Sequence, residues 1–285
     1  MNFRFDYLLK TASQQLQSRS DSAKFDAELL LAYVLKKDRS YLYTWPERQA
    51  TEAQYQDFEQ FIQRRLQGEP IAYIVGKQAF WTLNLKVSKD TLIPRPETEL
   101  LIETALDYYS PQDNLSILDL GTGTGAIALA IASEFTQSQL LAVDISSAAL
   151  DIAQDNAVQH GINNIQFLHS NWFNDIPSQH FDLILSNPPY IETDDPHLQQ
   201  GDLRYEPRLA LSSGKDGFRD IQQIIQSSQP YLKPQGWLMF EHGYQQASMA
   251  RQYLSQAKFN HIQSLRDLAG HERISMASMP ISPAR

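Results

Sequence analysis

A glycine-rich turn between two apolar segments limits the fold of this chain more than any other feature. Residues 117–120 form a short, mostly apolar run, residues 121–125 carry glycine at their first, third and fifth positions, and an alanine-rich segment follows from Ala126. Glycines at a strand-to-helix turn allow a tight bend and a close approach of the backbone to a ligand. The sequence therefore predicts a strand, a ligand-binding turn and a helix that open an α/β domain.

Short apolar runs and helical segments alternate beyond this turn. We expect strands at residues 117–120, 140–143, 165–168 and 181–185, and helices at residues 126–135 and 147–160. Such alternation is typical of a Rossmann-like doubly wound sheet, which has helices on both faces. Helices at 218–227 and 245–257 and strands at 237–241, near Ile262 and near Ile274 complete the prediction. A long polar loop after Tyr190 separates the two halves, and loops of that length are usually functional or disordered.

The first 70 residues have apolar side chains at helical spacing and predict a small helical bundle. The first expected stripe consists of Phe5, Leu8, Leu9, Ala12 and Leu16, and the second of Phe25, Leu29, Leu30, Tyr33 and Val34. Thr51 and Gln54 have the spacing of a capping box before a third helix, which Gly68 and Pro70 should end. Such a bundle suits either a passive cap or a substrate-docking domain.

Between the bundle and the α/β domain the pattern becomes rich in β-branched and aromatic residues. We expect a short hairpin within residues 71–87, a linker over residues 71–90 and the α/β domain over residues 91–285. Pro96 suits the first turn of a following helix, where the acidic residues Glu97 and Glu99 are favoured by the helix dipole.

Composition narrows the protein class. The chain has no cysteine, and its seven histidines show no close paired spacing, so we expect no metal site. No apolar run reaches 18 residues and the N-terminus has no continuous apolar stretch, which predicts a cytoplasmic protein without a membrane partner. The first 75 residues carry equal numbers of acidic and basic side chains, so the net charge of −9 belongs to the remainder. This acidity argues against a nucleic-acid partner.

The segment Asn187–Pro188–Pro189–Tyr190 follows the strand predicted at residues 181–185. The two pyrrolidine rings restrict their own φ angles and force the preceding residues into extended conformations. Because neither proline has an N–H, the Asn187 amide oxygen and the Pro188 carbonyl form a pair of acceptors with few competing donors. Such a pair suits the two hydrogens of a planar NH2 group.

The glycine turn alone permits a different cofactor. Gly121, Gly123 and Ala126 satisfy a loose dinucleotide-binding pattern, and Asp144 ends the second expected strand, where an acid binds ribose hydroxyls. A nicotinamide-dependent oxidoreductase therefore remains an alternative, although hydride transfer requires no NH2-binding motif. Asp144 alone is also explained as a helix cap.

The glycine turn, Asp144 and residues 187–190 together resemble class I S-adenosylmethionine-dependent methyltransferases that act on planar NH2 groups. The NPPY motif at this place is shared by adenine and glutamine-amide methyltransferases. Three further stretches resemble the HemK/PrmC family, the peptide chain release factor glutamine methyltransferases: residues 92–99 (LIPRPETE), residues 205–217 (YEPRLALSSGKDG), and Glu241, His242, Gly243 and Gln246. The similarity extends to Arg273, and the PETE continuation favours this family over the ribosomal-protein glutamine methyltransferases.

The resemblance implies a class I methyltransferase fold with an N-terminal helical domain and transfer of a methyl group from S-adenosylmethionine. The acceptor would be N(5) of the glutamine in the GGQ motif of release factors. The implied cofactor-binding residues are Gly121, Thr122, Gly123, Thr124, Gly125, Asp144, Trp172 and Asn187. The implied substrate-binding residues are Asn187, Pro188, Pro189 and Tyr190, of which Asn187 and Pro188 would be catalytic. This chain has Asn171 where the family commonly has Asp, so a charged contact to the adenine amino group is missing.

Three readings follow from the sequence. They are a protein-glutamine methyltransferase, a nucleic-acid adenine methyltransferase and a nicotinamide-dependent oxidoreductase. The acidic charge and the family stretches favour the first.

Overall fold

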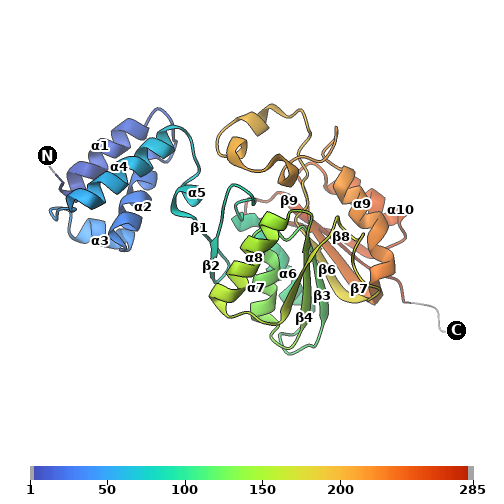
Figure 1. Cartoon of the computed structure of the whole chain (residues 1–285). Helices are drawn as coiled ribbons and strands as arrows, with labels where there is room; N and C mark the ends of the chain where they lie inside the picture. Colours follow the sequence, from blue (N-terminus) through green and yellow to red (C-terminus); the bar gives the residue numbers. More distant parts are fainter. Residues whose placement is uncertain (1–2, 282–285) are drawn as a thin grey trace. The chain divides into compact units, whose positions relative to one another are not determined.

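The computed structural model describes residues 3–281 and divides into two compact units (Figure 1). A helical unit comprises Met1–Lys77 and Gln199–Tyr205, and an α/β unit comprises Gln78–Leu198 and Glu206–Arg285. The outermost residues of the predicted domains, 1–2 and 282–285, lie outside the described part. Within residues 3–281, none of the helices combines the length and apolar character needed to cross a membrane.

The helical unit contains five helices around one apolar core. They are α1 (Phe5–Leu16), α2 (Ala23–Leu35), α3 (Arg39–Thr44), α4 (Glu52–Leu66) and α5 (Ile71–Val75). The predicted capping box starts α4: the Gln54 N–H donates to Thr51 Oγ1 at 3.2 Å, and the Thr51 N–H donates to Gln54 Oε1 at 2.9 Å. The apolar pattern predicted three of these helices, but not the short α3.

The stripe predicted for α2 is partly wrong. Phe25 and Tyr33 are 45% and 44% exposed, whereas the acidic residues Asp26 and Glu28 are buried. Asp26 accepts a hydrogen bond from Arg65 Nε at 2.7 Å, which makes its burial tolerable, and Glu28 is likewise ion-paired. The helix is therefore rotated relative to the predicted stripe and buries Ala27, Leu30, Leu31 and Ala32.

Residues 71–75, which the pattern predicts as part of a hairpin, form the helix α5. Pro70 stands at its N-cap, and Gly76 ends it with φ +70°, a conformation that glycine adopts without strain. The hairpin itself is shorter than the predicted range and consists of β1 (Lys77–Phe80) and β2 (Leu83–Lys86).

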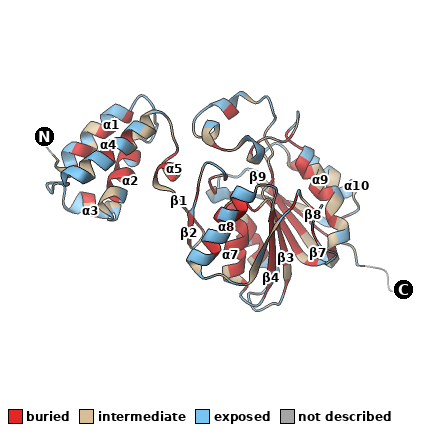
Figure 2. Ribbon diagram, in the orientation of Figure 1, coloured by how far each residue is buried: buried red, intermediate tan, exposed pale blue. Residues whose placement is uncertain are grey.

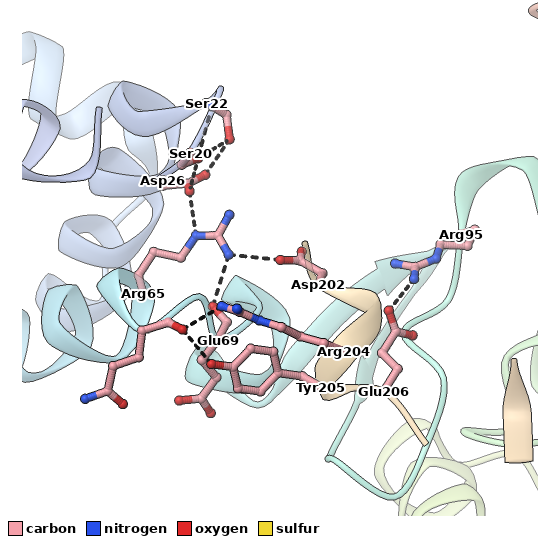
Figure 3. A network of polar contacts seen from close by, with 11 residues as sticks. Ser20, Ser22, Asp26, Arg65, Glu69, Arg95, Asp202, Arg204, Tyr205 and Glu206 are labelled. Carbon is pink, nitrogen blue, oxygen red and sulfur yellow. Dashed lines mark hydrogen bonds and ion pairs between the residues drawn. The ribbon is translucent and has the colours of Figure 1, made fainter. Parts of the chain in front are cut away.

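The second segment of the helical unit comes from the long loop after Tyr190. Arg65 lies between two carboxylates, because its Nε donates to Asp26 and its Nη1 donates to Asp202 at 3.0 Å (Figure 3). Arg204 Nη2 and the Tyr205 hydroxyl both donate to the Gln67 carbonyl at 2.7 Å. Residues 199–205 are thus bonded to the end of α4.

The α/β unit contains a seven-stranded sheet in the order β5-β4-β3-β6-β7-β9-β8. The strands are β3 (Ser116–Leu120), β4 (Gln139–Asp144), β5 (Ile165–His169), β6 (Phe181–Ser186), β7 (Leu232–Glu241), β8 (Asn260–Arg266) and β9 (Glu272–Ser278). Strands β3 to β7 pair in parallel, and β9 is antiparallel to both of its neighbours. The doubly wound fold predicted from the sequence is confirmed.

Helices cover both faces of this sheet, and the strands between them are mostly buried (Figure 2). One apolar cluster includes α6 (Glu99–Tyr108), α7 (Ala126–Glu134) and α8 (Ser147–His160), and the other includes α9 (Arg219–Ser228) and α10 (Ala247–Gln256). Alternate residues of a strand enter opposite clusters, as Ile117 and Leu118 of β3 do. Two-sided burial explains why the central strands read as continuous apolar runs.

Candidate active site

A cavity of about 430 Å³ lies at the carboxyl ends of β3, β4, β5 and β6. Parallel α/β sheets bind their ligands at this edge, near the point where the strand order reverses. Of the predicted site residues, the cavity is lined by Gly121, Thr122, Gly123, Thr124, Asp144, Trp172, Asn187 and Pro189. Gly125, Pro188 and Tyr190 stand directly beside these residues in the chain but are not part of the lining.

The glycine turn has three residues in the left-handed region: Gly121, Gly123 and Gly125 have φ angles of +72°, +55° and +81°. A Cβ atom on Gly125 would lie 3.0 Å from Leu129 Cδ1 and 3.2 Å from Ala153 Cβ, so a side chain there would be tightly packed as well as strained by the positive φ. A Cβ atom on Gly123 would meet nothing within 4 Å. Gly123 therefore presents open backbone to the cavity, which suits a close-lying ligand.

Asp144 connects the glycine turn to the beginning of α8. Its Oδ2 accepts from the Gly123 N–H and its Oδ1 accepts from the Ser146 N–H, both at 2.8 Å. The helix cap is Ser146, whose hydroxyl accepts from the Ala149 N–H. Burial raises the pKa of Asp144, while these N–H donors act in the opposite direction. Each carboxylate oxygen keeps a free lone pair, so Asp144 can also accept from two ligand hydroxyls.

Asp119, on β3 directly before the turn, is fully buried. Within residues 3–281, neither of its carboxylate oxygens has a hydrogen-bond partner, and the same holds for the Thr122 hydroxyl. Burial, and to a smaller extent the Asp144 carboxylate, raises the pKa of Asp119 to about 7, while the Thr122 side chain and the Ala128 N–H act in the opposite direction. These two groups therefore lie near the carboxyl, and Asp119 itself is not part of the cavity lining. The sequence analysis assigns Asp119 no role, because it is one polar residue in an otherwise apolar strand.

Trp172 supplies the aromatic wall of the cavity. Its backbone has φ +51°, an uncommon value for a bulky residue, and its carbonyl accepts from the Ser170 hydroxyl at 2.8 Å. A Cβ atom on Gly121 would lie 3.3 Å from the Trp172 ring, so the turn and the indole are in close contact. Asn171 also lines the cavity. This end of the cavity suits a flat heteroaromatic ring.

Asn187 follows β6 and donates from Nδ2 to the Thr98 hydroxyl at 3.0 Å. Pro188 is buried, and within the described chain no main-chain donor is paired with its carbonyl. Tyr190 is not part of the cavity lining, and its hydroxyl donates to Glu241 Oε1 at 2.8 Å. The NPPY segment thus places Asn187 and Pro189 at the cavity, whereas Tyr190 is hydrogen-bonded to Glu241.

The long loop returns to the α/β unit at Glu206, whose carboxylate is buried. Glu206 Oε2 accepts from the Ile93 N–H at 3.1 Å, and Arg95 is ion-paired with Oε1 (Figure 3). The residues that follow add apolar surface to the cavity. Lining residues without a predicted role include Phe80, Leu92, Pro94, Thr98, Pro207, Leu209, Ala210 and Gln223. Two family stretches, residues 92–99 and 205–217, had already pointed to most of them.

These residues fit S-adenosylmethionine. Asp144 suits the ribose hydroxyls, the Trp172 wall suits the adenine ring, and open backbone at Gly123 suits a ligand that lies against the turn. The fold and the site define a class I S-adenosylmethionine-dependent methyltransferase.

Comparisons with known proteins identify the particular family. A PrmC N-terminal domain matches residues 7–76, and a methyltransferase domain matches residues 111–276. The release factor glutamine methyltransferase of Aliivibrio fischeri is 47% identical over 97% of this chain and 98% of its own length. That of Coxiella burnetii is 47% identical over 94% of this chain and 96% of its own. The chain belongs to the release factor glutamine methyltransferase family.

Solved structures agree on the fold. A methyltransferase from Pyrococcus furiosus is similar with a TM-score of 0.54 at 16% identity, over 77% of this chain and 98% of its own. A 16S rRNA N2 G1207 methyltransferase from Thermus thermophilus, solved with AdoMet and guanosine, is similar with a TM-score of 0.51 at 19% identity. That similarity covers 71% of this chain and 49% of the Thermus chain. Because the fold serves different acceptors, the acceptor must be argued from the site.

Proposed function

We propose that this enzyme methylates N(5) of the glutamine in the GGQ motif of peptide chain release factors, with Asn187 and Pro188 holding the glutamine amide. The observation that carries the proposal is the orientation of Asn187. Its Nδ2 is engaged by Thr98, so Oδ1 is the end of the amide that stays available at the cavity. An acceptor oxygen beside the cofactor cavity suits a substrate NH2 group.

The difficulty of the reaction lies in the nucleophile, because the lone pair of an amide nitrogen is delocalised into the carbonyl. When bound, S-adenosylmethionine supplies an electrophilic methyl group on a sulfonium. Asn187 Oδ1 and the Pro188 carbonyl would each accept one amide hydrogen, which fixes the direction of the nitrogen lone pair. Acceptors on both hydrogens also stabilise the positive charge that develops on nitrogen as it forms a new bond. No side chain need act as a strong base, since the proton becomes acidic only as the methyl group is transferred.

The remaining substrate-binding residues have different places in this proposal. Pro189 lines the cavity and gives the glutamine side chain an apolar surface. Tyr190 supports the segment from behind, through its bond to Glu241. The helical unit would dock the folded release factor, and the reaction would take place in the cytoplasm, where release factors act.

An adenine NH2 group would satisfy the same two acceptors. These acceptors alone therefore do not distinguish a nucleic-acid substrate from a protein substrate, and the rest of the protein must decide. The acidic charge of the catalytic part opposes a polyanion, as does the match of nearly the whole chain to protein methyltransferases. We therefore propose that neither nucleic acid nor a membrane is a partner.

Mass spectrometry of a release factor after incubation with enzyme and S-adenosylmethionine tests the proposal. A mass increase of one methyl group should appear on the GGQ glutamine. Asn187→Ala should lower turnover by about 10² because a hydrogen bond to the reacting amide is lost, whereas cofactor affinity should change little. Asn163→Ala, which alters an exposed asparagine, is the matched control and should keep wild-type turnover. Methylation of added DNA, with none of the release factor, would contradict the proposal.

A further inference from the structure

Behind Asn187 lies a chain of hydrogen bonds that ends at a buried carboxylate. Asn187 Nδ2 donates to Thr98 Oγ1 at 3.0 Å, and Thr98 Oγ1 donates to Glu241 Oε2 at 2.6 Å. Tyr190 donates to the other oxygen of the same carboxylate. Thr98 and Glu241 are only 3% and 2% exposed, so little water competes for these bonds. The three side chains come from different elements: Thr98 precedes α6, Glu241 ends β7, and Asn187 follows β6.

We propose that Thr98 and Glu241 are positioning residues that select the amide orientation of Asn187 in which Oδ1 faces the substrate. Burial raises the pKa of Glu241, but the Thr98 and Tyr190 hydroxyls that donate to it and the charge of Arg273 act in the opposite direction and favour the ionised carboxylate, which can only accept hydrogen bonds. The single Thr98 hydroxyl proton is therefore committed to Glu241, and the oxygen of that hydroxyl can only accept from Asn187. Of the two ends of the Asn187 amide, only Nδ2 can satisfy it. The inference rests on the proposed function, because it assigns the machinery that makes Asn187 an acceptor for an amide NH2 group.

The alternative orientation explains why such control is needed. An asparagine amide rotated by half a turn exchanges its oxygen and nitrogen with almost no change in shape. It would then present N–H donors to a substrate NH2 group, which has only donors of its own. A methyltransferase for amide nitrogen thus needs a device that excludes the rotated state, and the buried Glu241–Thr98 pair is such a device. The family stretch with the sequence LIPRPETE supplies this threonine.

The test compares Thr98→Val with Thr98→Ser and Thr104→Val. Valine keeps the shape of threonine but removes the hydroxyl, so kcat should fall by about tenfold or more while the affinity for S-adenosylhomocysteine stays near wild type. Serine keeps the hydroxyl and should retain most of the turnover. Thr104 is an equally buried threonine on α6 whose hydroxyl donates to the Leu100 carbonyl. Thr104→Val therefore loses a buried hydrogen bond that is not part of the Asn187–Thr98–Glu241 chain. Its kcat should not change.

A double-mutant cycle with Asn187→Ala separates positioning from a general structural effect. If Thr98 acts through Asn187, Thr98→Val should cause no further loss of turnover in the Asn187→Ala enzyme. The same loss in both backgrounds, or a Thr98→Val enzyme as active as Thr104→Val, would overturn the inference. Binding of S-adenosylhomocysteine, measured by calorimetry, verifies that each variant is folded. Failure of the proposed function itself would look different, because the wild-type enzyme would leave the release factor unmethylated.

Discussion

Asp119 and Asp144, at the residue scale, are two acids near the glycine turn with different surroundings. The Asp119 carboxyl is fully buried, and among the residues that the structure describes neither of its oxygens has a hydrogen bond of good geometry, although the Thr122 side chain and the Ala128 N–H lower its pKa. Asp144, by contrast, has two N–H donors and a defined orientation. The two acids therefore differ: Asp144 lines the cavity in a fixed orientation, whereas Asp119 is enclosed by the protein.

The raised pKa of Asp119 predicts a pH-dependent stability of the free protein. Its pKa rises from an ordinary value of 3.8 to about 7 on burial, so between these values the folded state holds a proton that the unfolded state has lost. The free energy of unfolding should then fall as the pH rises through this window. Asp119→Asn removes that contribution. The melting temperature of Asp119→Asn minus that of the wild type, followed by calorimetry without cofactor, should become more positive from pH 5 to pH 8. A constant difference would contradict the prediction.

At the scale of elements, the glycine turn separates two requirements that sequence alone does not distinguish. A Cβ atom on Gly125 would be tightly packed against Leu129, whereas a Cβ atom on Gly123 would meet nothing within 4 Å. Both positions belong to the same sequence motif. The structure shows that the first is restricted by packing and that the second faces open space at the cavity.

Gly123→Ala and Gly161→Ala form a matched pair that tests this distinction. Gly161 ends α8 with φ +66°, close to the +55° of Gly123, and a Cβ atom at either position would meet nothing within 4 Å. Alanine in this conformation should cost about 1 kcal/mol of stability at both positions. Only Gly123→Ala should also weaken S-adenosylhomocysteine binding in calorimetry, since only that methyl group enters the cavity. Equal affinities would show that the ligand does not approach Gly123.

The elements that the sequence predicted well are those whose burial follows a simple period. The central strands, α7 and α8 were located within about one residue at most ends, because both faces of the sheet are covered and the glycine turn fixes its start. The prediction failed where ion pairs allow acidic residues to be buried. In α2, ion-paired Asp26 and Glu28 are buried, so the helix presents a different face to the core from the predicted one. It also failed at α5, where β-branched residues form a helix between Pro70 and Gly76.

The site was predictable to a similar extent. The turn, Asp144 and Asn187 follow strand ends, which can be recognised from sequence. The partnership of Thr98 with Asn187 joins residues 89 positions apart, and no local pattern indicates it. The position of Tyr190 behind the cavity likewise depends on Glu241, which lies on another strand.

For the whole molecule, the path of the chain is the main feature. The chain passes from one unit to the other three times, because residues 199–205 leave the α/β unit, bond to the end of α4 and return at Glu206. The residues directly after this excursion line the cavity. Two chain segments, the loop and the linker, therefore join the helical unit to the unit that holds the cofactor cavity. The HemK/PrmC-like stretch YEPRLAL, residues 205–211, includes Glu206, where the chain re-enters the α/β unit.

Asp202→Ala should loosen this loop without unfolding the protein. The Asp202 side chain is 43% exposed, so loss of its ion pair with Arg65 should cost ~1 kcal/mol or less. Arg65 keeps its bond to Asp26. Hydrogen exchange should become faster in peptides that cover residues 199–205 while the melting temperature stays nearly constant. Asp57→Ala, an exposed site on α4, is the control and should leave the exchange of the loop unchanged.

The last prediction concerns the part of the substrate that lies beyond the reacting glutamine. In the proposed function, the two acceptors at Asn187 and Pro188 would recognise only an NH2 group, so they could not by themselves select a release factor. Selection must come from contacts remote from the reaction, for which the helical unit and the loop over residues 191–217 are the available surfaces. Remote contacts also contribute to the rate, because binding energy away from the reacting atoms holds the amide in its reactive position.

A short GGQ peptide should therefore be a much poorer substrate than a folded release factor, with kcat/KM lower by about 10² or more. The two substrates can be compared by transfer of a labelled methyl group at equal cofactor concentration. Asn187→Ala should reduce turnover of both by a similar factor, because both place the same amide between the same acceptors. Duplex DNA added in excess should neither take up label nor slow methylation of the release factor. If the peptide reacts as fast as the folded protein, recognition ends at the NH2 group, and the helical unit has no part in choosing the substrate.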